Sequence, residues 1–200
     1  MLLLTTLFGC AKKVKLTIDG TVPSSQTTLY LIVNEDTANA RQIPINDGKF
    51  SVSLKVDKND IIRLHDSKQW PERSPFVLIP DSRHITVDGL DYRIEGSPLS
   101  QRLQAAVDMV RRASPEGFHV DVFSEDKEAW AEARAMERKM REQMLAEQRQ
   151  IIESIIRDNR DNIIPAWIVY CYPELVEPVM PGLTLDEPKW ANHPVLQKKK

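Results

Sequence analysis

The spacing of the apolar residues changes once along this chain, at Ser97-Pro98, and this change constrains the fold more than any other feature. Over residues 14–96 the apolar side chains recur mainly at every second position, which is typical of β-strands with one buried face. After Pro98 they recur at every third or fourth position, as in amphipathic helices. The sequence therefore predicts an α+β protein, in which an antiparallel β-sandwich over residues 11–96 precedes a helical region over residues 97–180.

Seven or eight short apolar runs predict the strands of this sandwich. Asp47-Gly48 separates two alternating runs, and this pair is a strong hairpin signal because primed turns need a positive φ that glycine tolerates. The outward positions carry Lys, Arg and Asp, which suits a sheet with one wet face. The runs cover residues 14–18, 29–33, 41–45, 50–56, 61–64, 76–79, 85–87 and 92–94.

One long helix is predicted in the second half of the chain. A first helix is expected to begin at Pro98 after an N-cap at Ser97, because proline's missing N–H costs nothing at the first helical position. A second helix, capped by Ser124, is predicted to reach about Asn159, and at 1.5 Å per residue it would be roughly 50 Å long. Such a helix either kinks near residues 148–150 or projects in part.

The last part of the chain is predicted to contain a third helix and then to lose regular structure. The third helix is expected from Asn162, with Trp167 among its buried residues. Prolines then recur at short intervals, and proline in a helix interior removes a hydrogen bond. We therefore expect an irregular tail over residues 181–200.

The first ten residues form a short apolar segment that ends in a cysteine. Nine residues would cover about 14 Å as a helix, far short of the ~30 Å of a bilayer core, so this is no transmembrane helix. Leu7-Phe8-Gly9-Cys10 resembles the lipobox of bacterial lipoproteins, in which residues 1–9 would be removed and the Cys10 thiol acylated. The resemblance implies a lipid anchor at the cell envelope, facing the periplasm or the outer surface. The alternative is a buried N-terminal strand or helix with Cys10 in the core.

Composition and motifs argue against several classes of function. The chain has 27 basic and 29 acidic residues, so it lacks the basic excess of a nucleic-acid-binding protein. The four histidines are far apart in the sequence, and there is no P-loop, dinucleotide fingerprint or Gly-x-Ser-x-Gly motif. We therefore expect no cofactor, no metal and no catalytic residue. A hydrolase assembled from distant Asp, Glu and His residues is the remaining enzyme hypothesis, and it requires a deep pocket with convergent polar groups.

Cys171 is the only cysteine besides Cys10. Acylation of Cys10 would leave Cys171 alone, so we expect no internal disulfide. A cysteine in the apolar sequence around position 171 most often behaves as a small apolar side chain. A redox role or a partner contact at Cys171 would need a positive neighbour and access to solvent.

Several short segments, taken in order, resemble one family. They are similar to the domain of unknown function that precedes a thioredoxin-like thiol–disulfide domain in many Bacteroidetes-type envelope lipoproteins, and the similarity covers residues 14–175. That redox domain acts through a Cys-x-x-Cys pair, which this sequence does not contain, so we do not expect its activity here. The similar segments are Leu16–Gly20, Leu29–Leu31, Asp47–Phe50, Phe76–Pro80, Ile94–Ser100 and Asn159–Asn162.

Together these observations predict a non-catalytic lipoprotein of the cell envelope with a binding or structural role. Its expected partners are the membrane, through the lipid anchor, and an envelope protein, while the small-molecule ligand is not indicated by the sequence. The alternative is an accessory or remnant component of a periplasmic thiol–disulfide system, and that function would involve Cys171.

Overall fold

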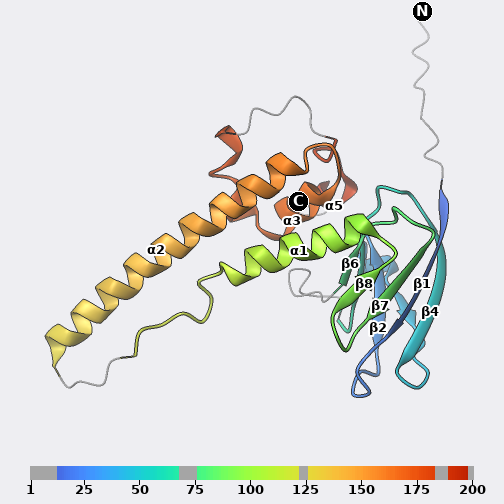
Figure 1. Ribbon diagram of the computed structural model, residues 1–200, viewed down its shortest axis with the longest axis horizontal. Helices are drawn as coiled ribbons and strands as arrows, with labels where there is room; N and C mark the ends of the chain where they lie inside the picture. Colours follow the sequence, from blue (N-terminus) through green and yellow to red (C-terminus); the bar gives the residue numbers. More distant parts are fainter. Residues whose placement is uncertain (1–12, 68–75, 122–125, 183–188, 198–200) are drawn as a thin grey trace, which may run out of the picture. The chain divides into compact units, whose positions relative to one another are not determined.

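The computed structural model describes residues 13–67, 76–121, 126–182 and 189–197. Two four-stranded sheets come first and helices follow, one of them long, so the protein has the α+β fold that the sequence predicts (Figure 1). The chain divides into two compact units, Met1–Gln101 and Arg102–Lys200. The predicted signal segment, residues 1–10 with Cys10, lies outside the described residues, so the lipid anchor stays a prediction.

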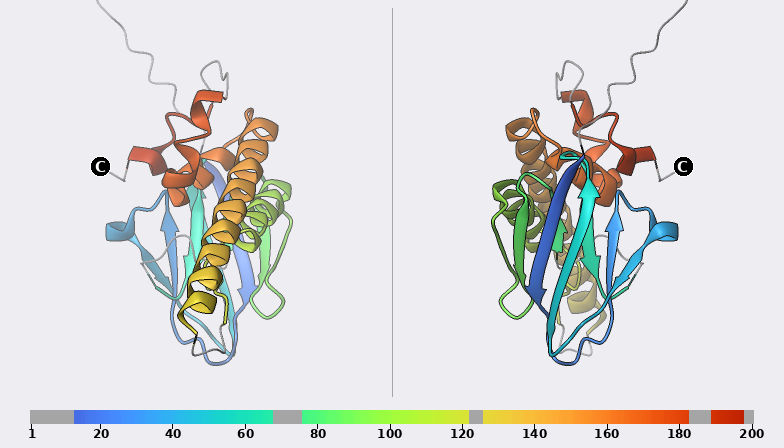
Figure 2. Two further views of the ribbon diagram at one scale, coloured as in Figure 1. Left: turned by 90° about the vertical axis from the view of Figure 1, so that its left-hand side faces the viewer. Right: turned by 90° about the vertical axis from the view of Figure 1, so that its right-hand side faces the viewer.

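The first unit is a β-sandwich, and all eight predicted strands are present. Hydrogen-bonded neighbours follow the order β4-β1-β7-β8 in sheet A and β3-β2-β5-β6 in sheet B. Figure 2, right, shows β1 in dark blue beside β4 in cyan. A short 3-10 helix, η1 (Thr37–Asn39), lies between β2 and β3. The strands are β1 (Val14–Thr21), β2 (Leu29–Val33), β3 (Arg41–Ile43), β4 (Lys49–Val56), β5 (Ile62–His65), β6 (Phe76–Leu78), β7 (His84–Asp88) and β8 (Arg93–Glu95).

One strand pair corrects the antiparallel prediction. Strand β7 runs parallel to β1, with Thr17 opposite His84 and Thr21 opposite Asp88, whereas the other pairs of strands are antiparallel. The chain passes from β6 in sheet B to β7 in sheet A, and a strand that enters from the other sheet is free to run in either direction. Alternation of apolar residues sets the face of a strand, not its neighbour, so the sequence could not show this pairing.

The Asp47-Gly48 hairpin forms as predicted. The φ angles of these two residues are 51° and 70°, the positive values that a type I′ turn requires. The backbone groups of Asn46 and Lys49 close the turn with two hydrogen bonds of 2.8 and 2.9 Å. Pro44 has no N–H to give to a ladder, which explains why β3 ends at Ile43 rather than at residue 45.

The two sheets share one apolar core. Along β1, Leu16 and Ile18 are fully buried, while Thr17 between them faces outward. Gly20, the next inward position, lies opposite Phe50, and a Cβ there would come within 2.7 Å of the Phe50 ring. Because Gly20 has no side chain, the Phe50 ring can pack over β1 at this position. The core also contains Val22, Leu29, Leu31, Ile43, Val52, Val56, Ile62, Leu64, Phe76, Leu78, Ile85, Val87 and Ile94.

A buried ion pair lies on sheet B. Because Ile62 and Leu64 point into the core, Arg63 between them points to the opposite face, and its side chain is nevertheless 0% exposed. Its guanidinium donates two hydrogen bonds of 2.7 and 2.8 Å to the two carboxylate oxygens of Glu35, whose side chain is 3% exposed. This two-pronged geometry is the strongest form of Arg–carboxylate contact. The carboxylate therefore compensates a positive charge that water does not reach.

The turn after β2 holds Glu35 in place. Asn34 and Glu35 have φ angles of 49° and 55°, in the left-handed region that residues other than glycine seldom adopt. Two hydrogen bonds between Asn34 and the backbone of Ile61 fix this turn: the Asn34 N–H donates to the Ile61 carbonyl at 2.8 Å, and the Ile61 N–H donates to the Asn34 side chain at 2.9 Å. The unusual backbone thus directs the Glu35 carboxylate to Arg63.

Helix α1 (Pro98–Arg112) begins with every early N–H group satisfied. Its first residue is proline, which has no N–H. The Leu99 N–H donates to the Asp81 carboxylate at 2.8 Å, and the Ser100 N–H donates to the Ser97 hydroxyl oxygen at 3.1 Å. Ser97 is thus the N-cap, as predicted, and Asp81 is a second acceptor that the sequence did not indicate.

The remaining polar groups at this helix start are also paired. The Ser100 hydroxyl oxygen accepts from the Ile79 N–H at 2.8 Å, and the Gln101 side chain donates to the Ile94 carbonyl at 2.8 Å. Ser97 and Ser100 are both 0% exposed, so the hydrogen bonds of these two serines replace water. The start of α1 is therefore hydrogen-bonded to three residues of the sandwich unit, Ile79, Asp81 and Ile94.

Besides residues 102–112 of α1, the second unit contains one long helix and several short ones. Helix α2 is continuous through residues 148–150, where the sequence allows a kink. Its N-cap is Asp126, whose carboxylate accepts from the Glu128 N–H at 2.9 Å, whereas the predicted cap, Ser124, lies outside the described residues. Residues 181–200, expected to be irregular, include a short helix that contacts α3. The helices are α2 (Lys127–Asp158), α3 (Ile164–Cys171), α4 (Pro173–Val176), the 3-10 helix η3 (Met180–Gly182) and α5 (Pro194–Gln197).

The substitution Glu35→Gln tests the buried ion pair. It leaves the Arg63 charge buried without a carboxylate, and removal of one partner of such a pair costs about 3–5 kcal/mol. We expect the free energy of unfolding to fall by about 3 kcal/mol or more in urea denaturation followed by circular dichroism. The matched control is Asp91→Asn, which removes a carboxylate from an Arg93 contact where both side chains are 63% exposed, and it should cost less than about 1 kcal/mol. A loss for Glu35→Gln no larger than that of the control would contradict this account.

Candidate functional site

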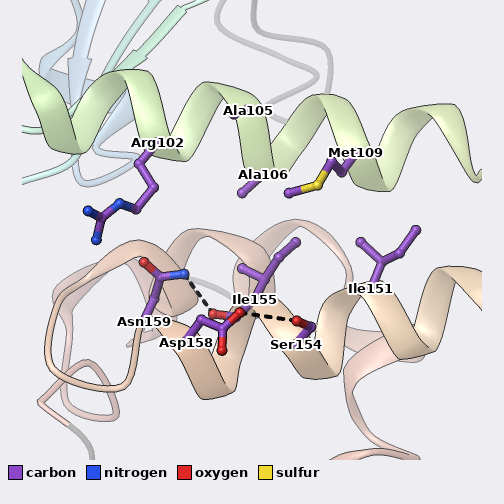
Figure 3. Close-up of a pocket in the computed structure, with 9 residues that line it drawn as sticks. All are labelled: Arg102, Ala105, Ala106, Met109, Ile151, Ser154, Ile155, Asp158 and Asn159. Atoms are coloured by element: carbon purple, nitrogen blue, oxygen red, sulfur yellow. Dashed lines mark hydrogen bonds between the residues drawn. The ribbon is translucent and has the colours of Figure 1, made fainter.

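A groove lies between α1 and the C-terminal part of α2, within the second unit (Figure 3). Its volume is about 380 Å³. Five of its lining residues are apolar, and four residues with polar side chains gather toward the end formed by the last turn of α2. We call it the α1–α2 groove. It is lined by Arg102, Ala105, Ala106, Met109, Ile151, Ser154, Ile155, Asp158 and Asn159.

Small side chains on α1 keep the groove open. The buried stripe of α1 contains Val107 and Val110, and the Gln148 side chain of α2 donates a 2.9 Å hydrogen bond to the Val110 carbonyl. Where the two helices face each other beside this contact, α1 presents Ala105 and Ala106. Alanine carries one methyl group, so it cannot fill the space that a larger residue would occupy between packed helices.

The apolar end of the groove is adaptable. Met109 from α1 and Ile151 from α2 both extend into the space between the two helices there, and Met109 is 49% exposed (Figure 3). Methionine is unbranched and polarizable, so it repacks readily around ligands of different shape. The groove therefore has a wall that can adjust to an apolar group.

The polar end is organised by the end of α2. Asn159, the C-cap residue, is buried; its amide donates to the Ile155 carbonyl at 2.8 Å and its oxygen accepts from the Asn162 side chain at 3.1 Å. Asp158 accepts a 3.1 Å hydrogen bond from the Ser154 hydroxyl one turn earlier. These bonds fix the side chains of Asn159 and Asp158 along the floor of the groove.

Arg102 completes the polar end from α1. Its guanidinium extends across the groove toward Asn159 (Figure 3). With the residues that the structure describes, Arg102 makes no hydrogen bond and no ion pair, and it is exposed. The groove thus presents one positive and one negative side chain beside an apolar surface.

Charged residues of α2 bind the segment that precedes this helix, residues 113–121. Arg141 lies in α2, donates to the carbonyls of Pro115 at 3.3 Å and of Phe118, and pairs with Glu137 at 3.0 Å. The hydrogen bond from Arg141, and after it the one from the Val120 N–H, hold the Glu137 pKa below its ordinary value of 4.5. The His119 pKa is raised above 6.5, first by its bond to the Gly117 carbonyl and then by neighbouring carboxylates.

Of the two cysteines that the sequence singles out, the structure describes Cys171. It is the last residue of α3 and is half-buried. The C-terminal end of a helix carries a negative partial charge, which does not favour a thiolate. The helix end thus does not supply the positive neighbour that a reactive thiol needs, and the thiol–disulfide alternative stays a prediction.

The histidines lie in four separate places. Among the described residues no three His, Cys, Asp or Glu side chains gather closely enough to hold a metal ion. Of the described residues that line the α1–α2 groove, one carries a carboxylate and none is a histidine, so they do not supply the convergent groups that the hydrolase hypothesis requires. The histidine partners are Ser67 for His65, Asp19 for His84, Asp121 for His119 and Val195 for His193.

None of the described helices combines the length and the apolar composition needed to cross a membrane. No protein-family model matches the chain, and no curated protein matches it. The resemblance to envelope lipoproteins therefore stays a prediction. The groove was missed from the sequence, although Ala105-Ala106 within an otherwise bulky helical stripe is a signal that could have indicated a gap.

The attachment of the 113–121 segment to α2 should depend on pH. Glu137 is a carboxylate whose pKa is lowered in the folded protein. Such a group stabilises the folded state at a pH above its ordinary pKa, and this contribution is lost as the pH falls through its pKa in the folded protein. His119 is a histidine whose pKa is raised in the folded protein. Such a group stabilises the folded state at a pH below its ordinary pKa, and this contribution is lost as the pH rises through its pKa in the folded protein. Both contributions are present together between pH 4.5 and pH 6.5.

Hydrogen exchange of the Val120 amide, which donates to Glu137, measures this effect. We expect its protection factor to be highest between pH 4.5 and 6.5 and to fall on either side. In His119→Gln the fall on the alkaline side should disappear. An identical pH profile in this variant and in the unaltered protein would show that His119 makes no contribution.

Proposed function

We propose that this protein is a lipid-anchored, non-catalytic protein of the cell envelope that binds a small ligand in the α1–α2 groove. The observation that carries the proposal is the groove itself, a largely apolar concavity of about 380 Å³ with a few charged and polar groups at one end. Ligand sites in proteins are typically apolar concavities of about 300–1,000 Å³ in which a few polar groups set orientation.

The chemistry of the groove favours binding over catalysis. Nucleophilic catalysis needs a nucleophile within hydrogen-bond reach of a base that a third group orients. Among the described residues that line the groove, the one hydroxyl group belongs to Ser154, which donates to Asp158 in the same helix. That bond is a local contact between successive turns, with no lining histidine to take a proton. Arg102 and Asp158 are therefore assigned to orientation of the ligand.

The anchor rests on the segment that ends at Cys10. Acyl chains on this cysteine would hold the protein at a membrane by about 0.8 kcal/mol per buried methylene, and more than one chain gives lasting attachment. The folded units would then lie at the membrane surface, facing the periplasm or the exterior. The membrane is the first partner of the protein in this proposal, and an envelope protein is the second.

Mass spectrometry of the protein from its native membranes tests the anchor. We expect the N-terminal peptide to begin at Cys10 and to carry the mass of attached acyl chains, because signal cleavage precedes acylation in lipoproteins. A Cys10→Ser variant should lose these masses and leave the membrane fraction. An unmodified chain that still begins at Met1 would overturn the anchor.

Ala105→Phe tests the groove. Ala105 is an exposed lining residue, so a phenylalanine there fills the groove without replacing a core side chain. The probe is 8-anilinonaphthalene-1-sulfonate, followed by the ¹³C-methyl NMR signals of Met109 and Ile151 in the full chain. We expect saturable shifts in the unaltered protein and at least tenfold weaker binding in Ala105→Phe. The matched control is Ala135→Phe, on an exposed face of α2 away from the groove, which should bind as the unaltered protein does.

Equal probe binding by both phenylalanine variants, or the absence of shifts at Met109 and Ile151, would show that the groove is not a binding site.

A further inference from the structure

The polar end of the α1–α2 groove carries two opposite charges that are not paired with each other. Arg102 enters from α1 and Asp158 from α2 (Figure 3). No ion pair joins them, and within the described part of the chain the Arg102 guanidinium has no partner. Asp158 accepts one hydrogen bond, from Ser154 through its Oδ2 atom. Both side chains are exposed and can therefore contact a ligand.

The position of Asp158 strengthens the negative side of this end. Asp158 is the last residue of α2, where the backbone carbonyls give the helix a negative partial charge. The carboxylate adds to that charge rather than opposing it. A positively charged ligand group would thus be attracted by Asp158 and by the helix end together.

We infer that the groove binds the zwitterion of an apolar α-amino acid. This inference rests on the proposed binding function and names its ligand class. The ligand carboxylate pairs with Arg102, whose planar guanidinium matches a carboxylate in a two-pronged contact. The ligand ammonium pairs with Asp158. The apolar side chain packs against Ala105, Met109 and Ile151.

The charge balance selects a zwitterion over a singly charged ligand. A purely anionic ligand pairs with Arg102 and leaves the Asp158 carboxylate uncompensated, so it binds less tightly than a zwitterion. A purely cationic ligand pairs with Asp158 and leaves Arg102 uncompensated. A molecule that carries an ammonium and a carboxylate group on one carbon atom compensates both side chains.

The walls of the groove select the rest of the ligand. A volume of about 380 Å³ lies near the lower end for ligand sites, which favours a small molecule. Burying a charged or polar side chain against apolar walls without a partner is unfavourable. Leucine, isoleucine and methionine therefore fit better than aspartate or lysine, and the flexible Met109 accommodates their different branching.

The test compares L-leucine with two analogues that each lack one charge. These are 4-methylpentanoate, which has no ammonium, and 3-methylbutylamine, which has no carboxylate. Binding to the full chain is followed by the ¹³C-methyl signals of Met109 and Ile151. We expect leucine to bind at least tenfold more tightly than either analogue.

Charge-neutral variants assign each ligand group to its partner. Arg102→Gln should weaken leucine binding at least tenfold and leave 3-methylbutylamine binding unchanged. Asp158→Asn should weaken leucine binding at least tenfold and should not weaken 4-methylpentanoate. The matched controls are Arg112→Gln and Asp161→Asn, which remove an exposed charge of the same sign from outside the groove and should leave leucine binding unchanged.

The outcomes separate this inference from the proposed function. If the anilinonaphthalene probe binds in the groove but leucine binds no better than its two analogues, the zwitterion assignment is wrong and groove binding stands. Leucine binding that is unaffected by Arg102→Gln or by Asp158→Asn would also overturn the assignment. If neither leucine nor the probe shifts Met109 and Ile151, both proposals fail.

Discussion

The start of helix α1 includes two serines that water does not reach, so their polar groups need partners from the protein. Ser97 and Ser100 are both fully buried, and Asp81 supplies a carboxylate to the Leu99 N–H at 2.8 Å. An unpaired buried donor costs about 1–3 kcal/mol, so a helix shifted by one residue would lose these contacts and be disfavoured. The start of α1 is therefore fixed, and with it the positions of Arg102 and Ala105 on the helix surface one and two turns later.

The groove depends on what α1 presents at those positions and on where α2 ends. Alanines on α1 leave space against Ile151 and Ile155, while the last residue of α2 brings a carboxylate to the same end as Arg102. The apolar part can remove a hydrocarbon group from water, and the charges can orient its polar end. A concavity of this kind between two helices fits a binding protein, which must recognise a ligand without changing it.

The sequence predicts the parts of this fold that depend on local patterns. Alternation along the chain gave all eight strands, Asp47-Gly48 gave a type I′ hairpin, and Ser97 before a proline gave the start of α1. Contacts between distant segments were not predictable, because apolar spacing sets the face of an element and not its neighbour. The parallel pairing of β1 with β7 and the meeting of Arg102 with the end of α2 both belong to this class.

The central claim is that a small molecule with an apolar side chain and charged groups binds between α1 and α2. Intermolecular nuclear Overhauser effects between bound L-leucine and the full chain measure this contact directly. The account predicts cross-peaks from the leucine methyl groups to the methyl groups of Met109 and Ile151, with no such peaks in Ala105→Phe. Cross-peaks only to residues outside the groove, or cross-peaks that persist unchanged in Ala105→Phe, would contradict it.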